Sequence, residues 1–155
     1  MLTYGIISDQ DGVVIVNGIG EICGACFLVD RDFYRGARKL KGTFMTSIYI
    51  AESSRGRGLS RLLMDSAITE CERRNSAFAI LIARRAVDHF YNKFSFWGLS
   101  QYSKINLNLA GILSAGENYS IYPATEEDLA AVGDLYESTY SGLYGSCVRS
   151  VEYWR

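Results

Sequence analysis

The chain has 155 residues, of which 48% are hydrophobic and 21% are charged; this composition predicts a folded domain rather than a disordered chain. Its 16 basic and 17 acidic side chains give a net charge of −1, which argues against nucleic acid as a partner. No apolar run approaches the roughly 20 residues that span a bilayer, and the first residues lack the features of a signal peptide. We therefore expect a cytoplasmic protein with no membrane partner.

Short β-prone runs fill the first third of the chain. We predict strands at residues 4–8, 13–16, 22–29 and 43–51. The segment between the last two strands, residues 30–41, is basic and holds Arg31, Arg35, Arg38, Lys39 and Lys41. We interpret it as a solvated hairpin loop; the alternative is a lip that meets an anionic ligand.

The cysteines provide one candidate metal or redox site. Cys23 and Cys26 have Cys-x-x-Cys spacing, but no second such pair follows and the only histidine is His89. Residues three apart on a strand point to opposite faces, so the two sulfurs would not converge. We predict no metal and interpret both as small buried apolar residues.

After residue 58 the apolar residues recur at three- and four-residue steps. This spacing predicts a helix over residues 58–74 with one buried face. A continuous apolar run at residues 77–83 then predicts a central parallel strand covered on both faces. Strand, helix and strand in this order form a right-handed βαβ crossover, so the fold class is α/β. The buried face of the helix is predicted from Leu59, Leu62, Leu63, Ala67, Ile68 and Cys71.

Less regular elements follow. We predict a short helix at residues 87–93, strands at residues 96–99 and 104–109, and a further short strand at residues 119–122. Thr125 to Asp128 resembles a capping box. The apolar spacing after it predicts a second amphipathic helix.

A glycine-rich turn joins the strand at residues 43–51 to the helix at 58–74. Gly56 and Gly58 let the backbone approach a ligand closely, and the first helical N–H groups have no partner within the helix. Together they form a seat for a phosphate or pyrophosphate. A dinucleotide-binding fingerprint is not complete, because Arg61 stands where a third glycine is needed.

These residues resemble the GCN5-related N-acetyltransferase (GNAT) superfamily. The acyl-CoA loop of that family, Arg/Gln-x-x-Gly-x-Gly/Ala, is similar to residues 55–60, Arg-Gly-Arg-Gly-Leu-Ser. A second family segment, "FY-x-K-x-GF", is similar to residues 90–96, with Ser95 where glycine is usual. The resemblance covers about residues 3–109. It implies a mixed, mostly antiparallel central sheet with a βαβ acyl-CoA-binding core and flanking helices.

The resemblance implies acetyl transfer from acetyl-CoA, as co-substrate, to an amine of a small molecule or peptide. Backbone N–H groups of residues 56–60 would hold the pyrophosphate, and backbone groups of Ile48 and Ile50 would run beside the pantetheine arm. A bulged strand end near Ile50 would leave an N–H free to polarise the thioester carbonyl. Tyr91 would be the general acid that protonates the departing thiolate; its alternative role is packing. The cofactor-binding residues expected are Ile48, Ile50, Arg55, Gly56, Arg57, Gly58, Leu59 and Ser60.

The sequence motifs do not identify the general base. Glu52, at the open end of the strand, is the first candidate and Glu21 a poorer one, and each is also explained as an exposed carboxylate. We interpret His89 as structural. Arg57 and Arg61 either reach CoA phosphates or are solvated.

We divide the chain into an acetyltransferase-like core (residues 1–110), a linker (111–118) and a strand-helix segment (119–155) that resembles the start of another acetyltransferase domain. The core in turn lacks most of the family's usual opening elements. We therefore expect one of three arrangements: a piece of a tandem protein, a permuted domain, or a tail exchanged with a second copy. We expect a homodimer. The alternative to an active enzyme is a non-catalytic CoA-binding or interaction module.

Overall fold

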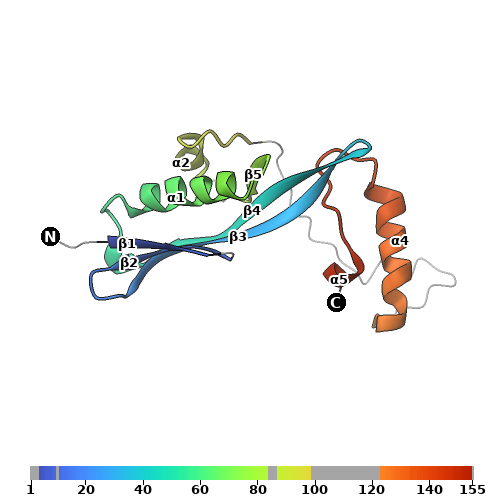
Figure 1. The fold of residues 1–155 in the computed structure, drawn as a ribbon, viewed down its shortest axis with the longest axis horizontal. Coiled ribbons are helices and arrows are strands. Elements are labelled where there is room, and N and C mark those ends of the chain that lie inside the picture. Colours follow the sequence, from blue (N-terminus) through green and yellow to red (C-terminus); the bar gives the residue numbers. More distant parts are fainter. Residues whose placement is uncertain (1–3, 10, 84–86, 99–122, 155) are drawn as a thin grey trace, which may run out of the picture.

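The computed structural model describes residues 4–9, 11–83, 87–98 and 123–154 (Figure 1). Its five-stranded sheet has the order β1-β2-β3-β4-β5. The first three pairings are antiparallel, and β4 pairs with β5 in parallel, which confirms the predicted mixed, mostly antiparallel sheet. The strands are β1 (Tyr4–Ser8), β2 (Gly12–Asn17), β3 (Ile22–Arg35), β4 (Arg38–Ile50) and β5 (Phe78–Leu81).

One face of the sheet is covered by α1 (Leu59–Arg73), which connects β4 to β5, and by the short helix α2 (Asp88–Asn92) (Figure 1). Alternation places Val13 and Ile15 of β2 beneath α1, where both are buried. From α1, Leu63, Met64 and Ala67 are fully buried in the same core. The predicted helix is confirmed, but Met64 lies in the core where Leu62 was expected, and Leu62 is 36% exposed.

The opposite face is more open than expected. Phe27 and Tyr49 are 50% and 55% exposed. β5 pairs with β4 in parallel, as predicted, but all four of its residues are only half-buried, so the predicted coverage of both faces is incomplete. Residues 96–98 do not form the strand expected there, and the strands predicted at 104–109 and 119–122 lie outside the described residues.

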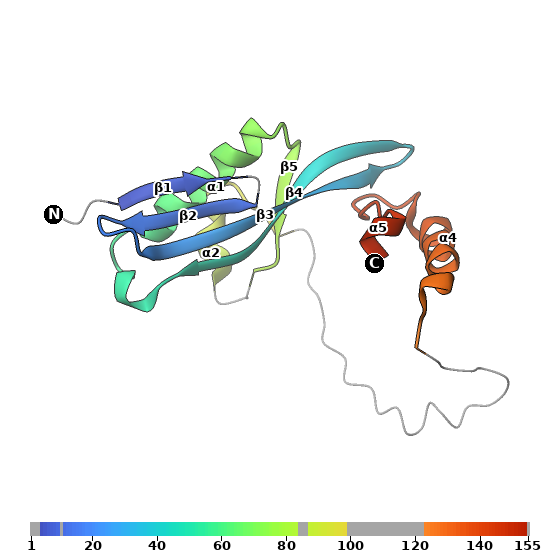
Figure 2. The ribbon, with the colours of Figure 1, turned by 60° about the horizontal axis from the view of Figure 1, so that its bottom comes forward.

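The basic segment at residues 30–41 is not a loop, as predicted, but the distal part of a long β3–β4 hairpin. Pairing continues to Arg35 opposite Arg38, and only Gly36 and Ala37 form the turn, with Gly36 at φ 60°. The strands persist because apolar residues continue among the charges: Phe33 is buried and its ring packs against Phe78 at 5.0 Å. The distal hairpin projects beyond the rest of the sheet (Figure 2).

The C-terminal segment lies beside this distal hairpin (Figure 2). It contains a turn of 3-10 helix, η3 (Glu126–Asp128), followed by α4 (Leu129–Tyr140) and α5 (Val151–Trp154). The predicted capping box between Thr125 and Asp128 is present. The domain boundaries remain predictions. No helix in the described ranges is long and apolar enough to cross a membrane.

Backbone bonds attach this segment to β3. The Tyr34 N–H donates to the Ser146 carbonyl at 2.9 Å, the Gly145 N–H donates to the Tyr34 carbonyl at 2.9 Å, and the Val148 N–H donates to the Asp32 carbonyl at 2.8 Å. The tail thus extends the sheet along the β3 edge that β2 does not reach.

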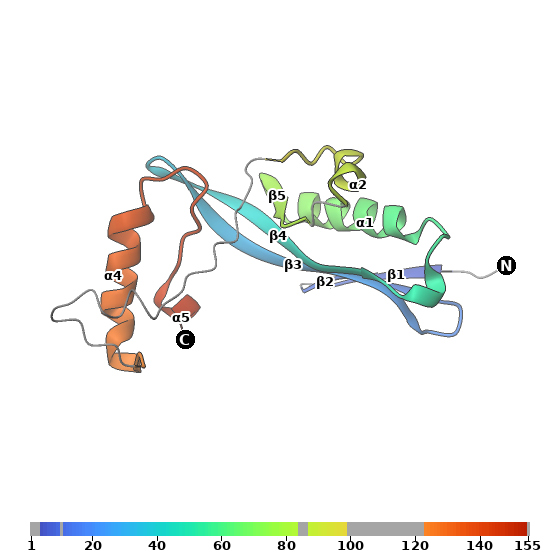
Figure 3. The same ribbon diagram turned by 180° about the vertical axis from the view of Figure 1, so that it is seen from behind.

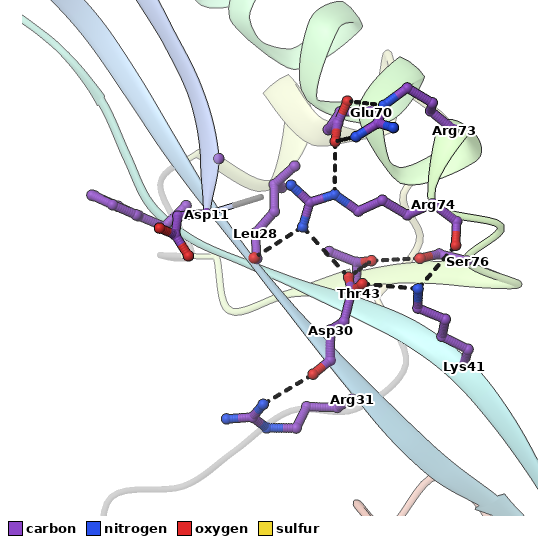
Figure 4. Close-up of polar contacts among 12 residues, drawn as sticks. Asp11, Leu28, Asp30, Arg31, Lys41, Thr43, Glu70, Arg73, Arg74 and Ser76 are labelled. Atoms are coloured by element: carbon purple, nitrogen blue, oxygen red, sulfur yellow. Dashed lines mark hydrogen bonds and ion pairs between the residues drawn. The ribbon is translucent and has the colours of Figure 1, made fainter. Parts of the chain in front are cut away.

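A polar network fixes the C-terminal end of α1 to the sheet (Figure 4). The Arg74 side chain is 8% exposed and contacts the buried carboxylate of Glu70 at 2.9 Å. Its guanidinium also donates to the backbone carbonyls of Leu28 and Asp9, at 3.3 and 2.7 Å. Arg74 therefore occupies the β3 edge just beyond the end of β2 and orients the helix whose other end forms the candidate site.

Candidate active site

The candidate site begins where β4 extends beyond the end of β5. Their pairing ends at Met45 opposite Leu81, and β4 continues to Ile50. The N–H of Ala51 donates to the Cys23 carbonyl at 2.8 Å. Because backbone groups alternate between the two edges of a strand, the N–H and carbonyl of Ile50 face away from β3. This edge can therefore hydrogen-bond an extended ligand.

A bulge interrupts β4 close to this edge. Thr46 pairs with Phe27 and Tyr49 pairs with Ala25, so Ser47 and Ile48 together face the single residue Cys26. Ser47 has φ 52°, a left-handed conformation that is uncommon for residues other than glycine. The expected bulge is present, but it begins three residues before Ile50. No glycine marks the position, so the sequence pattern does not predict the left-handed conformation of Ser47.

The glycine turn follows η1 (Glu52–Ser54), the 3-10 turn after β4 (Figure 3). Gly56 and Gly58 adopt φ 73° and 76°, and a Cβ built on either would meet no protein atom within 4 Å. The loop backbone is therefore open to a ligand from outside and requires glycine for its conformation. These observations fit a loop whose backbone can approach a phosphate group closely.

The start of α1 supplies backbone N–H groups that can donate hydrogen bonds to a ligand. Its first internal bonds come from the N–H groups of Arg61 and Leu62, which both donate to the Gly58 carbonyl, at 3.0 and 3.3 Å. The N–H groups of Leu59 and Ser60 precede these bonds and point out of the helix end, where the dipole is positive. The side chain of Leu59 is 5% exposed and packs in the core, so Leu59 can contribute only its backbone to the site.

Arginine side chains flank the glycine turn and the start of α1. Arg55 Nε donates to the carbonyl of Ile50 at 3.4 Å, which joins the glycine turn to the free edge of β4. Arg57 is exposed. Arg61 forms a long, exposed ion pair with Asp65 at 3.7 Å.

Tyr91, on α2, lies against the core beside Phe90 and Phe96. Burial raises the pKa of the Tyr91 phenol, and the neighbouring Cys26 thiol raises it further. Cys26 is the residue that faces the bulge, and Tyr91 packs against the core cluster that contains Cys26. Ser95 adopts φ 63°, which explains why a glycine is usual at that position.

The candidate bases are less well defined. Glu52 is exposed at the first position of η1, directly after β4. Glu21 accepts a hydrogen bond from the Asn17 side chain at 2.8 Å in the β2–β3 turn. His89 is exposed, and no contact joins it to the bulge among the interactions of the described residues.

The predicted burial of Cys23 and Cys26 is confirmed, and no disulfide joins the four cysteines. Burial is the main cause that raises the pKa of Cys26, to about 12, so its thiol is neutral near pH 7. Within the described ranges, no group of three or more His, Cys, Asp or Glu side chains is placed to hold a metal.

Several solved structures with a similar fold are described as acetyltransferases, all at low sequence identity. A provisionally named acetyl transferase from Pyrococcus furiosus is 14% identical with a TM-score of 0.56, and the match covers 62% of this chain and 64% of that one. Glucosamine-6-phosphate N-acetyltransferase from Arabidopsis thaliana is 19% identical with a TM-score of 0.52, over 63% and 68%. A structure described as a "predicted acetyltransferase with acetyl-CoA" from Clostridium acetobutylicum is 21% identical with a TM-score of 0.51, over 66% and 67%.

At these identities the likeness shows the fold. The chain spans less than two thirds of the length of the Pyrococcus protein. No curated protein sequence matches the chain. A family model does match: residues 3–96 correspond to the "Acetyltransferase (GNAT) family", and the chain belongs to that family.

Proposed function

We propose that this protein transfers an acetyl group from acetyl-CoA to an amine of a small molecule or peptide. The observation that carries the proposal is the order of three features along the chain. The bulge at Ser47 and Ile48 lies opposite Cys26, β4 then continues beyond its pairing with β5, and the glycine turn leads into the start of α1.

The backbone would bind and orient the co-substrate. N–H groups of residues 56–60 would hold the pyrophosphate at the positive end of α1. The backbone of Ile48 and Ile50 would hydrogen-bond the pantetheine arm as an added strand would. The positive charges of Arg55, Arg57 and Arg61 would favour phosphates nearby. Acetyl-CoA supplies the activated acyl group as a thioester.

Two protons must move during the transfer. A bond forms between the acceptor nitrogen and the acetyl carbon, and the bond from that carbon to sulfur breaks. Tyr91 would give its hydroxyl proton to the leaving sulfur, a role that its raised pKa supports because the phenol stays protonated near pH 7. The acceptor attacks as the neutral amine and loses one proton as the amide forms. We propose Glu52 as the acceptor of that proton, directly or through water, and Tyr91 regains its own proton from solvent.

Release of free thiol from acetyl-CoA, measured against a panel of amines, tests the proposal. The panel contains amino sugars, polyamines, amino acids and lysine peptides, with a reaction without amine as control. We expect amine-dependent thiol release with at least one member and an equal amount of N-acetylated product by mass spectrometry. Acetyl-CoA binding without release for the whole panel would favour the alternative.

The alternative is a non-catalytic CoA-binding or interaction module. It is favoured by two departures from the family pattern. Ser60 stands where the pattern has glycine or alanine, and Ser95 stands where it has glycine. The alternative predicts that acetyl-CoA raises the melting temperature while no amine is acetylated.

For assembly, we propose a homodimer in which C-terminal segments can be exchanged. The apolar side chains Phe27 and Tyr49 on one sheet face, and Leu135 on α4, are 50%, 55% and 69% exposed, and a second copy would cover such surfaces. Light scattering of the full chain tests the dimer. A chain truncated after Ala110 should be insoluble or molten; a soluble, monomeric and equally heat-stable truncated chain would contradict the proposal.

A further inference from the structure

The turn of the β3–β4 hairpin brings two positive charges together. Arg35 and Arg38 are direct cross-strand partners, and both side chains are exposed. Like charges directly opposite each other destabilise a sheet. Nearer the body of the sheet, Lys41 and Arg74 both pair with Asp30. Among the ion pairs of the described residues, none neutralises Arg35 or Arg38.

The pair lines a pocket of about 390 Å³ that is open to solvent. Arg35 and Arg38 form its cationic side, and Leu40 and Tyr144 form an apolar wall. Tyr144 is 77% exposed and comes from the C-terminal segment. Its neighbour Gly145 is bonded to the Tyr34 carbonyl. Two segments distant in sequence thus build a single cationic and apolar surface.

The surroundings strengthen the positive field. Residues 31–41 hold five cationic side chains and one carboxylate, although the whole chain has a net charge of −1. Lys39 lies on the other face of the hairpin, where its ammonium group is 5.6 Å from the centre of the Tyr34 ring. A concentration of one sign of charge attracts and steers an oppositely charged partner.

The pocket is too far from the candidate active site to hold a small acceptor. Ser47 lies nine residues after Arg38 along β4, a span of about 30 Å at roughly 3.3 Å per residue. A ligand at the hairpin turn is therefore distinct from the acceptor amine at the candidate active site. Guanidinium groups bind carboxylates through paired hydrogen bonds, and the Leu40 and Tyr144 wall suits an apolar residue beside the carboxylate.

We propose that the tip of the hairpin, formed by Arg35, Arg38, Leu40 and Tyr144, is a docking site for an acidic polypeptide segment of a partner protein. The segment carries Asp or Glu next to an apolar side chain. The carboxylates neutralise the opposed arginines, and the apolar side chain covers Leu40 and the Tyr144 ring.

The test measures binding of a fluorescein-labelled peptide, Glu-Asp-Glu-Leu-Glu-Asp-Glu, to the full-length chain by fluorescence anisotropy. We expect saturable binding that weakens as salt rises. Arg35→Gln and Arg38→Gln should each weaken it at least fivefold, and Tyr144→Ala at least threefold. Lys39→Gln is the matched control, because it removes the same charge from the opposite face, and it should change binding less than twofold.

Folding of the variants is checked by thermal melting. Arg38→Glu places opposite charges at the turn, so its melting temperature should equal or exceed that of the parent chain while peptide binding is lost. Three results would overturn the proposal: no peptide binding at low salt, an equal loss from Lys39→Gln and Arg35→Gln, or binding of inorganic phosphate or single-stranded DNA as tight as that of the peptide.

Discussion

Tyr91 packs against the hydrophobic core that contains Cys26, the residue of β3 that faces the bulge of β4. Burial and the Cys26 thiol both raise the pKa of the Tyr91 phenol. The bulge involves two residues of β4 opposite one of β3. The tyrosine and the interrupted strand therefore share one hydrophobic core.

Replacement of Tyr91 by Phe should lower kcat by roughly 10²–10⁴-fold, the usual contribution of a general acid. Affinity for acetyl-CoA should remain nearly the same, because only the leaving thiolate needs the proton. Steady-state kinetics and titration calorimetry measure the two quantities. Equal turnover of variant and parent, with chemistry rate-limiting, would show that Tyr91 is only a packing residue.

The pH dependence of kcat gives a second test of Tyr91. A general acid acts in its protonated form, and the folded protein raises the pKa of this phenol above 10.0. Activity should therefore not fall through loss of the Tyr91 proton until the pH exceeds about 10. A decline in kcat between pH 7 and 9 that disappears in Tyr91→Phe would contradict this assignment.

The sequence predicted the elements whose signal is local. The three- and four-residue spacing gave α1 within one residue at each end, and Gly56 and Gly58 located the turn because left-handed backbone favours glycine. The distal hairpin was missed because its charged residues resemble a loop. The buried positions of Phe33 and Tyr34 depend on Phe78 and on the C-terminal segment, and these contacts are not local in sequence.

Prediction of the candidate site had the same limit, because contacts between distant residues are not visible in a local pattern. The backbone donors followed from the loop pattern, whereas Ser47 did not, because its φ of 52° is imposed by the pairing of β4 with β3. Cys26 was correctly predicted to be buried, but its position opposite the bulge depends on strand register. No residue pattern identified a base.

Arg74 and Arg73 allow a matched test of the network at the end of α1. Both contact Glu70, but the Arg74 side chain is 8% exposed and that of Arg73 is 68% exposed. Arg74→Met removes the buried partner of the Glu70 carboxylate, which keeps its bonds to Arg73, and should destabilise the protein by about 1–3 kcal/mol. Arg73→Met should leave the urea midpoint nearly unchanged. Equal losses of stability in urea denaturation would show that the buried Arg74 contact contributes no more than the exposed Arg73 contact.

Tyr34 and Glu137 test how the C-terminal segment is held. The Tyr34 hydroxyl donates to the Glu137 carboxylate at 2.6 Å, and this bond, with burial, raises the pKa of Tyr34 to about 12. A raised pKa in the folded state means that the stabilisation is complete below about pH 10 and is lost as the pH rises towards 12. Tyr34→Phe should increase hydrogen exchange at the Val148 amide a few-fold at pH 7, because Glu137 is exposed and water competes for it. Unchanged exchange at Val148 would assign the attachment to the backbone bonds alone.

Binding of acetyl-CoA to the full chain, measured as a shift in the melting temperature, tests the central claim most directly. At a concentration 100 times the dissociation constant, the gain in stability should be about 2.7 kcal/mol. Gly58→Val should abolish the shift, because φ 76° and close approach of a ligand both disfavour a branched side chain. Gly142→Val, at a glycine whose Cβ also meets nothing within 4 Å, should retain it. A folded protein with no shift at millimolar acetyl-CoA, or an equal shift in Gly58→Val, would contradict the proposed site.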